Sequence, residues 1–111
     1  MSSKKMIVAI IPAKGSSKRL PNKNMTKLLG KPLIQFTIDE ALKSKSIDRL
    51  YISTDNQNIE NYATSKNIRV IKRSEKLGGE TPIIDVYEHA YNSIEDKKNI
   101  EIMVGLQPDH P

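Results

Sequence analysis

The chain has no cysteine and no tryptophan, and aromatic residues make up only 5% of its 111 positions. Without cysteine it cannot form a disulfide, a thiolate nucleophile or a thiolate metal site, and the composition fits a reducing compartment. No apolar run approaches the roughly 20 residues of a membrane span, and the N-terminus lacks a signal-peptide cleavage pattern. We therefore expect a cytoplasmic protein with an aliphatic core and no membrane partner.

Acidic residues are absent from the first 38 positions, which carry eight of the 18 basic residues. The other positions hold ten basic and thirteen acidic residues, so the net charge of +5 comes from the first third of the chain. We interpret Lys4 and Lys5 as a solvated tail, whereas the later cations favour a polyanion site for a nucleoside triphosphate or a nucleic acid. A nucleic acid is disfavoured because no aromatic residue, the usual stacking platform, lies between Met1 and Gln35.

The apolar pattern alternates between strand-like and helix-like periodicity, and residues 1–111 are enough for one compact domain. Strands are predicted at Met6–Ile11, which Pro12 ends, and at Arg49–Ser53, Arg69–Lys72 and Ile100–Leu106. Helices are predicted at Pro32–Leu42, from a Thr54/Gln57 capping box to about Lys66, and from Thr81–Pro82 to about Ile94.

This order predicts an α/β fold with a doubly wound, mostly parallel sheet and helices on both faces. Ligands of such sheets bind at the carboxyl ends of the strands, so the loops after Ile11, Ser53, Lys72 and Leu106 are the places to look for chemistry. Few other polar residues suggest a site. Asp55 is interpreted as a helix-start residue in preference to a metal ligand. His89 is interpreted as a structural or surface residue, and Asp39-Glu40 as solvated helix positions.

The loop from Pro12 to Asn24 has the composition of a phosphate-binding segment. It combines a glycine, two serines and four cations: Gly15, Ser16, Ser17, Lys14, Lys18, Arg19 and Lys23. It matches neither the P-loop nor the dinucleotide-binding glycine pattern. On these features alone, a basic surface loop without a ligand stays an alternative.

Longer stretches resemble one known family. Ile10–Asn24, followed by Leu28–Ile34, is similar to the opening motif of the acylneuraminate cytidylyltransferases. Ile52–Asp55, Arg73–Asp85 and Leu106–Pro108 resemble three later motifs of that family, in the same order. The resemblance implies a Rossmann-like nucleotide-diphospho-sugar transferase fold, truncated here after its fourth strand.

The resemblance also implies roles for individual residues. Lys23 and Asn24 match a catalytic pair that contacts the triphosphate as pyrophosphate leaves. The implied nucleotide-binding residues are Ala13, Lys14, Gly15, Ser16, Ser17, Lys23, Asn24, Arg73 and Gln107. Departures from the family pattern, such as Lys14 in place of arginine and Asp109-His110 in place of Thr-Ser, bear on base and sugar recognition.

By this resemblance the complete enzyme transfers CMP from CTP to a 2-keto sugar acid of the sialic acid type, with release of pyrophosphate. CTP and the sugar acid are the expected partners, the complete enzyme is expected to be a homodimer, and Mg²⁺ is expected with ligands outside this chain. Two alternatives stay open: a transferase for another sugar such as 3-deoxy-octulosonate, and a non-catalytic nucleotide-binding remnant. We expect the 111 residues alone to be inactive, marginally stable and prone to self-associate.

Overall fold

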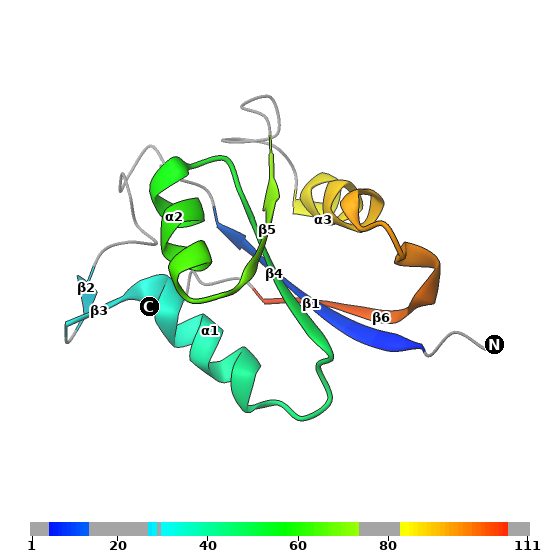
Figure 1. Ribbon diagram of the computed structural model, residues 1–111, viewed down its shortest axis with the longest axis horizontal. Helices are drawn as coiled ribbons and strands as arrows, with labels where there is room; N and C mark the ends of the chain where they lie inside the picture. The colour runs from blue at the N-terminus through cyan, green and yellow to red at the C-terminus, as the bar shows by residue number, and fades with distance from the viewer. Residues whose placement is uncertain (1–4, 14–26, 29, 74–82, 107–111) are drawn as a thin grey trace.

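The computed structural model describes residues 5–13, 27–28, 30–73 and 83–106. Four strands form a parallel sheet in the order β5-β4-β1-β6 (Figure 1). They are β1 (Met6–Ala13), β4 (Arg49–Thr54), β5 (Arg69–Lys72) and β6 (Ile100–Gly105). β4 and β5 lie on one side of β1, and β6 lies on the other. The order in which strands are added to the sheet therefore switches sides at β1. The doubly wound topology predicted from the sequence is confirmed.

Helices pack on both faces of this sheet, as Figure 1 shows. The helices α1 (Leu33–Lys43) and α2 (Gln57–Ser65) cover one face, where Ile34, Ile38 and Ile59 join Ile11 and Ile52 in one core cluster. On the other face lies α3 (Ile83–Ser93), followed by a 3₁₀ turn at Lys97–Asn99; its cluster contains Val8, Ile10, Tyr51, Ala90 and Ile94. Alternate residues of β1 and β4 therefore serve opposite faces, which explains why both strands are apolar throughout. Among the described residues, no helix is long and apolar enough to cross a membrane.

β1 is longer than its sequence predicted, and the predicted end at Ile11 is wrong. Pro12 pairs in register with Ser53 and Ala13 with Thr54. Proline lacks a backbone N–H, but its fixed φ is compatible with extended backbone near the end of a strand. β1 therefore extends two residues further than predicted, to the residue directly before the basic loop.

The predicted capping box at the start of α2 is also wrong. The N-cap is Asn56, whose side-chain oxygen accepts a hydrogen bond from the N–H of Ile59 at 3.1 Å. Thr54 instead ends β4, and its Oγ1 accepts from the N–H of Asn56 at 3.1 Å. Asparagine and threonine are both good caps, so sequence alone did not distinguish them.

A short antiparallel hairpin escaped prediction. Strands β2 (Lys27–Leu28) and β3 (Lys31–Pro32) pair ahead of α1, with Gly30 at φ 80° in the connection. Glycine adopts this left-handed conformation without a steric penalty. Two-residue strands leave no periodic pattern in a sequence, which explains the omission.

β6 lies at an edge of the described sheet and ends at Gly105, one residue before its predicted end. The N–H of Leu106 still donates to the carbonyl of Ile10 at 2.9 Å. A Cβ at position 105 would collide with the ring of Tyr87, so glycine lets α3 pack closely on this strand. On β6, Ile102 remains 49% exposed. The predicted self-association through this region stays a prediction.

Candidate functional site

The carboxyl ends of the four parallel strands meet at one edge of the sheet, which we call the carboxyl edge. Every buried polar or charged residue that the structure describes lies there: Ser53 is 0% exposed, Thr54 2% and Arg73 8%. Buried polar groups cost free energy unless they find partners, so their concentration at one edge marks it as specialised. This is the edge at which doubly wound sheets bind ligands.

Arg73 joins the ends of two strands at this edge. Its backbone N–H donates to the carbonyl of Thr54 at 2.8 Å, and its Nη2 donates to the carbonyl of Ser53 at 3.2 Å. Burial lowers the pKa of the Arg73 guanidinium, and the carboxylate of Asp55 opposes that shift. The side chain is thus an arginine held against the backbone of β4, in surroundings that raise the cost of its charge.

Two adjacent buried hydroxyls at this edge differ in their partners. Thr54 Oγ1 accepts the N–H of Asn56, which stabilises the turn into α2. Ser53 Oγ is buried and has no hydrogen-bond partner among the residues that the structure describes. Since a buried hydroxyl normally has a partner, this one is available to a group outside the described residues.

The structure describes two of the predicted site residues. Ala13 is fully buried at the end of β1, in the core cluster beneath α1 and α2, and Arg73 follows β5. The remaining predicted residues lie outside the described part of the chain: Lys14, Gly15, Ser16, Ser17, Lys23, Asn24 and Gln107. Ala13 ends β1 and Leu106 directly follows β6, and these two strands are neighbours in the sheet, so the chain leaves the described structure at the carboxyl edge in both places. Their joint role stays a prediction.

Carboxylates that could hold a divalent cation are sparse at this edge. Within the described ranges, no group of three or more His, Cys, Asp or Glu residues is arranged to bind a metal. Asp55 interacts electrostatically with Arg73. The described residues therefore contain no preformed cluster of metal ligands, and the prediction of Mg²⁺ with ligands outside this chain stays untested.

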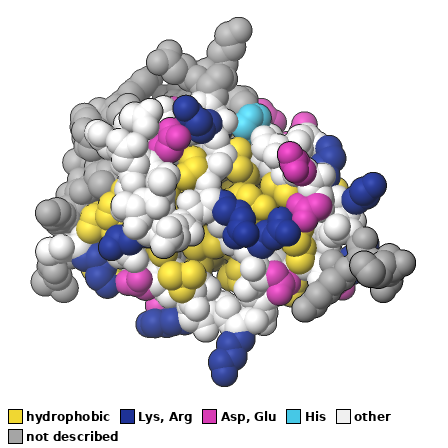
Figure 2. Space-filling model, viewed as in Figure 1, with side chains coloured by type: hydrophobic (Ala, Val, Ile, Leu, Met, Phe, Trp, Pro, Cys, Tyr) yellow, Lys and Arg dark blue, Asp and Glu magenta, His cyan; other side chains and the backbone are white. Residues whose placement is uncertain are grey.

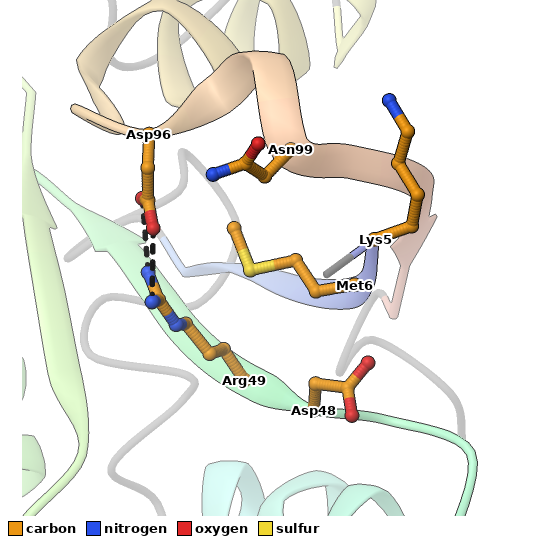
Figure 3. A pocket seen from close by; sticks show the side chains of 6 residues that line it. All are labelled: Lys5, Met6, Asp48, Arg49, Asp96 and Asn99. Carbon is orange, nitrogen blue, oxygen red and sulfur yellow. Dashed lines mark hydrogen bonds and ion pairs between the residues drawn. The ribbon is translucent and has the colours of Figure 1, made fainter. Parts of the chain in front are cut away.

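A cavity of about 350 Å³ lies at the opposite end of the strands, which we call the amino edge (Figure 3). It is lined by Lys5, Met6, Asp48, Arg49, Asp96 and Asn99. Figure 3 shows the guanidinium of Arg49 facing the carboxylate of Asp96, with Nη1–Oδ1 and Nη2–Oδ2 distances of 3.0 and 2.9 Å. Asp48 accepts the N–H of Ile7 at 2.7 Å. The charged groups of Arg49, Asp96 and Asp48 thus already have partners within the protein. The cavity also lies away from the edge where this fold binds ligands.

Sequence reasoning missed a polar network between the hairpin and the helices. Lys31 Nζ lies 2.7 Å from Asp39 Oδ2, and Gln35 Nε2 donates to Asp39 Oδ1 at 2.8 Å. These bonds, the one from Lys31 first, lower the pKa of Asp39. Both predicted positions are accessible to solvent, since the Asp39 side chain is 37% exposed and Glu40 is exposed, but the partners of Asp39 were not predicted. An i, i+4 spacing of Gln35 and Asp39 was the available signal.

The sequence model of one protein family, described as Cytidylyltransferase, matches residues 8–111. The chain belongs to this family. It is 33% identical over 105 residues to the N-acylneuraminate cytidylyltransferase of Escherichia coli O18:K1:H7 (strain RS218 / NMEC), covering 95% of this chain. Over 105 residues it is 31% identical to the 3-deoxy-manno-octulosonate cytidylyltransferase of Bdellovibrio bacteriovorus, again covering 95% of this chain.

The fold of this cytidylyltransferase-family chain has a solved counterpart. It superimposes with a TM-score of 0.82 on CMP:2-keto-3-deoxy-manno-octonic acid synthetase complexed with CTP, at 25% identity and over 96% of this chain. The chain spans 25% of the length of the Escherichia coli relative, 40% of the Bdellovibrio relative and 42% of the solved chain. The match therefore establishes the family and fold of this region.

Proposed function

We propose that this chain binds CTP and forms part of an enzyme that transfers CMP to a 2-keto sugar acid. The observation that carries the proposal is the gathering of Ser53, Thr54 and Arg73, all buried, at the carboxyl edge. β1 ends at that same edge and is followed in sequence by residues 14–24, which we call the basic segment. The family membership and the CTP named for the solved counterpart support the choice of nucleotide.

In the proposed reaction a hydroxyl of the sugar acid attacks the α-phosphorus of CTP and gives up its proton to water. The bond from that phosphorus to the oxygen bridging to the β-phosphate breaks, and pyrophosphate leaves with the bond's electron pair. Lys14, Lys23 and Asn24 would position the triphosphate and offset the charge that develops on the leaving group. A divalent ion would add to this neutralisation when bound.

Arg73 and Gln107 are assigned to the base and ribose in this proposal. The Arg73 guanidinium is anchored by the Ser53 carbonyl, so few rotamers compete with its observed position. A donor fixed in advance loses little entropy when a ligand binds. This property favours Arg73 as a recognition residue over a solvated surface arginine.

A sialic-type sugar acid is the first candidate substrate, and 3-deoxy-octulosonate is the second. Relatives named for each are of similar identity to this chain, 33% and 31%. Pyrophosphate release with each acid, measured on the chain and on any longer product that contains it, distinguishes the two. Nucleotide binding without turnover in any form would favour the non-catalytic remnant.

The surface seen in Figure 2 carries charges of both signs, with Asp and Glu side chains distributed among the Lys and Arg side chains. A nucleic-acid surface gathers positive charge into a patch or stripe. The described residues of this face carry both signs of charge and so do not by themselves favour a nucleic acid.

The nucleotide assignment is tested by thermal unfolding with CTP, ATP, GTP and UTP at equal concentrations. We expect CTP to raise the Tm most, because ligand binding to the native state stabilises it by linkage. Equal shifts with all four would leave a general triphosphate site, and no shift with any of them would overturn the proposal. A homodimer and a cytoplasmic location stay predictions.

A further inference from the structure

One chain of side-chain hydrogen bonds joins β3 and α1, which follow each other directly in the sequence, to α2, which begins 14 residues after α1 ends. Lys31 of β3 and Gln35 of α1 both donate to Asp39, and the hydroxyl of Tyr62 on α2 donates to Gln35 Oε1. The Lys31 ammonium also lies 4.7 Å from the centre of the Phe36 ring. Figure 1 shows the β2–β3 hairpin beside the start of α1, with α2 on the same side of the sheet.

The direction of each bond in this network is fixed by chemistry. An ionised Asp39 can only accept, so Gln35 must present its NH₂ group to it and its oxygen to Tyr62. A flipped amide would place an oxygen against the carboxylate. The network therefore depends on these side-chain types, because a glutamate at position 35 would set two carboxylates against each other.

The network lies at one end of the basic segment that carries Lys23 and Asn24. The other end of that segment is attached at Ala13, which is fully buried in the core. The chain re-enters the described structure at Lys27 in β2, whose recorded strand pairing is with β3. Lys31 of β3 is thus the hairpin residue through which the network holds the end of the basic segment that leads into β2.

We propose that Asp39, Gln35 and Tyr62 are positioning residues that hold the β2–β3 hairpin so that the segment before it can bind a triphosphate. The inference rests on the proposed function for its ligand. Neither the family match nor the predicted site residues assign a role to these three side chains.

A simple electrostatic role for Asp39 makes the opposite prediction. If its charge acts only at a distance, its removal favours binding of an anion, because a negative charge near the site is lost. Release of Lys31 would add a free cation and strengthen the same effect. The positioning role instead predicts weaker binding after the same substitution.

The experiment compares Asp39→Asn with Glu40→Gln in the full chain. Both substitutions remove one negative charge from α1, but the ion pair that Glu40 makes within the described residues is with Lys43, at 3.8 Å, and both side chains are more than 70% exposed. We expect Asp39→Asn to weaken CTP binding about five- to tenfold, the order of one ordinary hydrogen bond, because the Asp39 side chain is 37% exposed and its charge is screened by water. Gln35→Glu and Tyr62→Phe should weaken it in the same direction, and Glu40→Gln should leave it within about twofold of the unchanged chain.

A second measurement needs no nucleotide. Hydrogen exchange at the amides of Leu28 and Lys31 should be faster in Asp39→Asn and Tyr62→Phe than in Glu40→Gln, while exchange in the β1 core stays the same. Unchanged β1 exchange also shows that each variant is folded.

The two measurements distinguish the possible failures. Tighter CTP binding by Asp39→Asn, or hairpin exchange equal to that of Glu40→Gln, would overturn the positioning role. If the unchanged chain fails to bind CTP, the proposed function fails, and the exchange rates still decide whether the network holds the hairpin.

Discussion

The carboxyl edge and the amino edge of the sheet hold their polar groups in different ways. At the carboxyl edge Ser53, Thr54 and Arg73 are buried, and Arg73 donates to backbone carbonyls of β4. At the amino edge Arg49 and Asp96 are partly exposed, and each has the other as its charged partner. The carboxyl edge therefore has buried polar groups, whereas the amino edge has a pair of opposite charges that neutralise each other at the surface.

This difference shows why the position of a hollow is a weaker guide to function than the position of buried polar groups. The cavity of about 350 Å³ is at the amino edge. Its charged residues already satisfy protein groups, whereas Ser53 Oγ at the carboxyl edge has no partner among the described residues. The fold rule and the buried polar groups agree on the carboxyl edge.

Substitution of Arg73 and of Arg49 should give the clearest test of the difference between the two edges. We expect Arg73→Ala to lower the free energy of unfolding by about 1.5–3 kcal/mol, because a buried charged donor and its hydrogen bond to Ser53 are lost. Arg49→Ala should cost clearly less, since its pair with Asp96 is exposed to water and screened. Urea unfolding of both variants measures this, and equal losses would remove the distinction between the edges.

The basic segment at the carboxyl edge is tested by Lys23→Ala. We expect the dissociation free energy of CTP to fall by about 1–3 kcal/mol, the range for one charge-assisted hydrogen bond, with little change in stability. Lys4→Ala is the control, because Lys4 precedes β1 and lies in sequence beside the amino edge. Similar titrations of the two variants would mean that the segment is a solvated basic surface.

The two adjacent hydroxyls of β4 should respond with opposite signs. Thr54→Val keeps the side-chain shape but loses the bond from the Asn56 N–H, so we expect a loss of about 0.5–1.5 kcal/mol. Ser53→Ala removes a buried hydroxyl without a described partner, so stability should stay the same or rise by less than about 1 kcal/mol. Thermal and urea unfolding measure both effects. A clear loss for Ser53→Ala would locate a partner for its hydroxyl outside the described residues.

The smallest expected effect is a pH dependence at the amino edge. The hydrogen bond from Arg49 is the main cause that lowers the pKa of Asp96 below 3.8. The stabilisation is therefore fully present above that value and is lost as the pH falls through the lowered pKa. We expect Asp96→Asn to be less stable than the unchanged chain at pH 7 and to match it in strong acid. Glu95→Gln, an exposed neighbour with the same charge change, should show no such convergence.

The elements of the sheet could be predicted because each strand and helix carries its own apolar periodicity. Ile34, Ile38 and Ala41 mark the buried face of α1 at helical spacing, and β1 is apolar along its length because both faces are covered. Of the candidate site, the position of Arg73 at a strand end was predictable from its place after β5. Its burial against the Ser53 carbonyl was not, since that requires β4 and β5 to lie in register.

Capping and pairing depended on neighbours that local sequence does not specify. Thr54 and Asn56 are both competent caps, and the choice fell to Asn56 because Thr54 is held in the sheet beside Ala13 and Lys72. Asp39 remains partly exposed, and its bond from Lys31 depends on where the hairpin lies, which the helix pattern does not specify.

By itself the sequence determined the family, the alternating α/β order and the faces of the helices, because these follow from motifs and from periodicity within single elements. Only the tertiary structure decided that the buried polar residues gather at one edge and that Lys31, Asp39, Gln35 and Tyr62 form one network. Burial and partnership of a polar side chain are set by which elements meet around it. That information is shared between distant segments and is absent from any one of them.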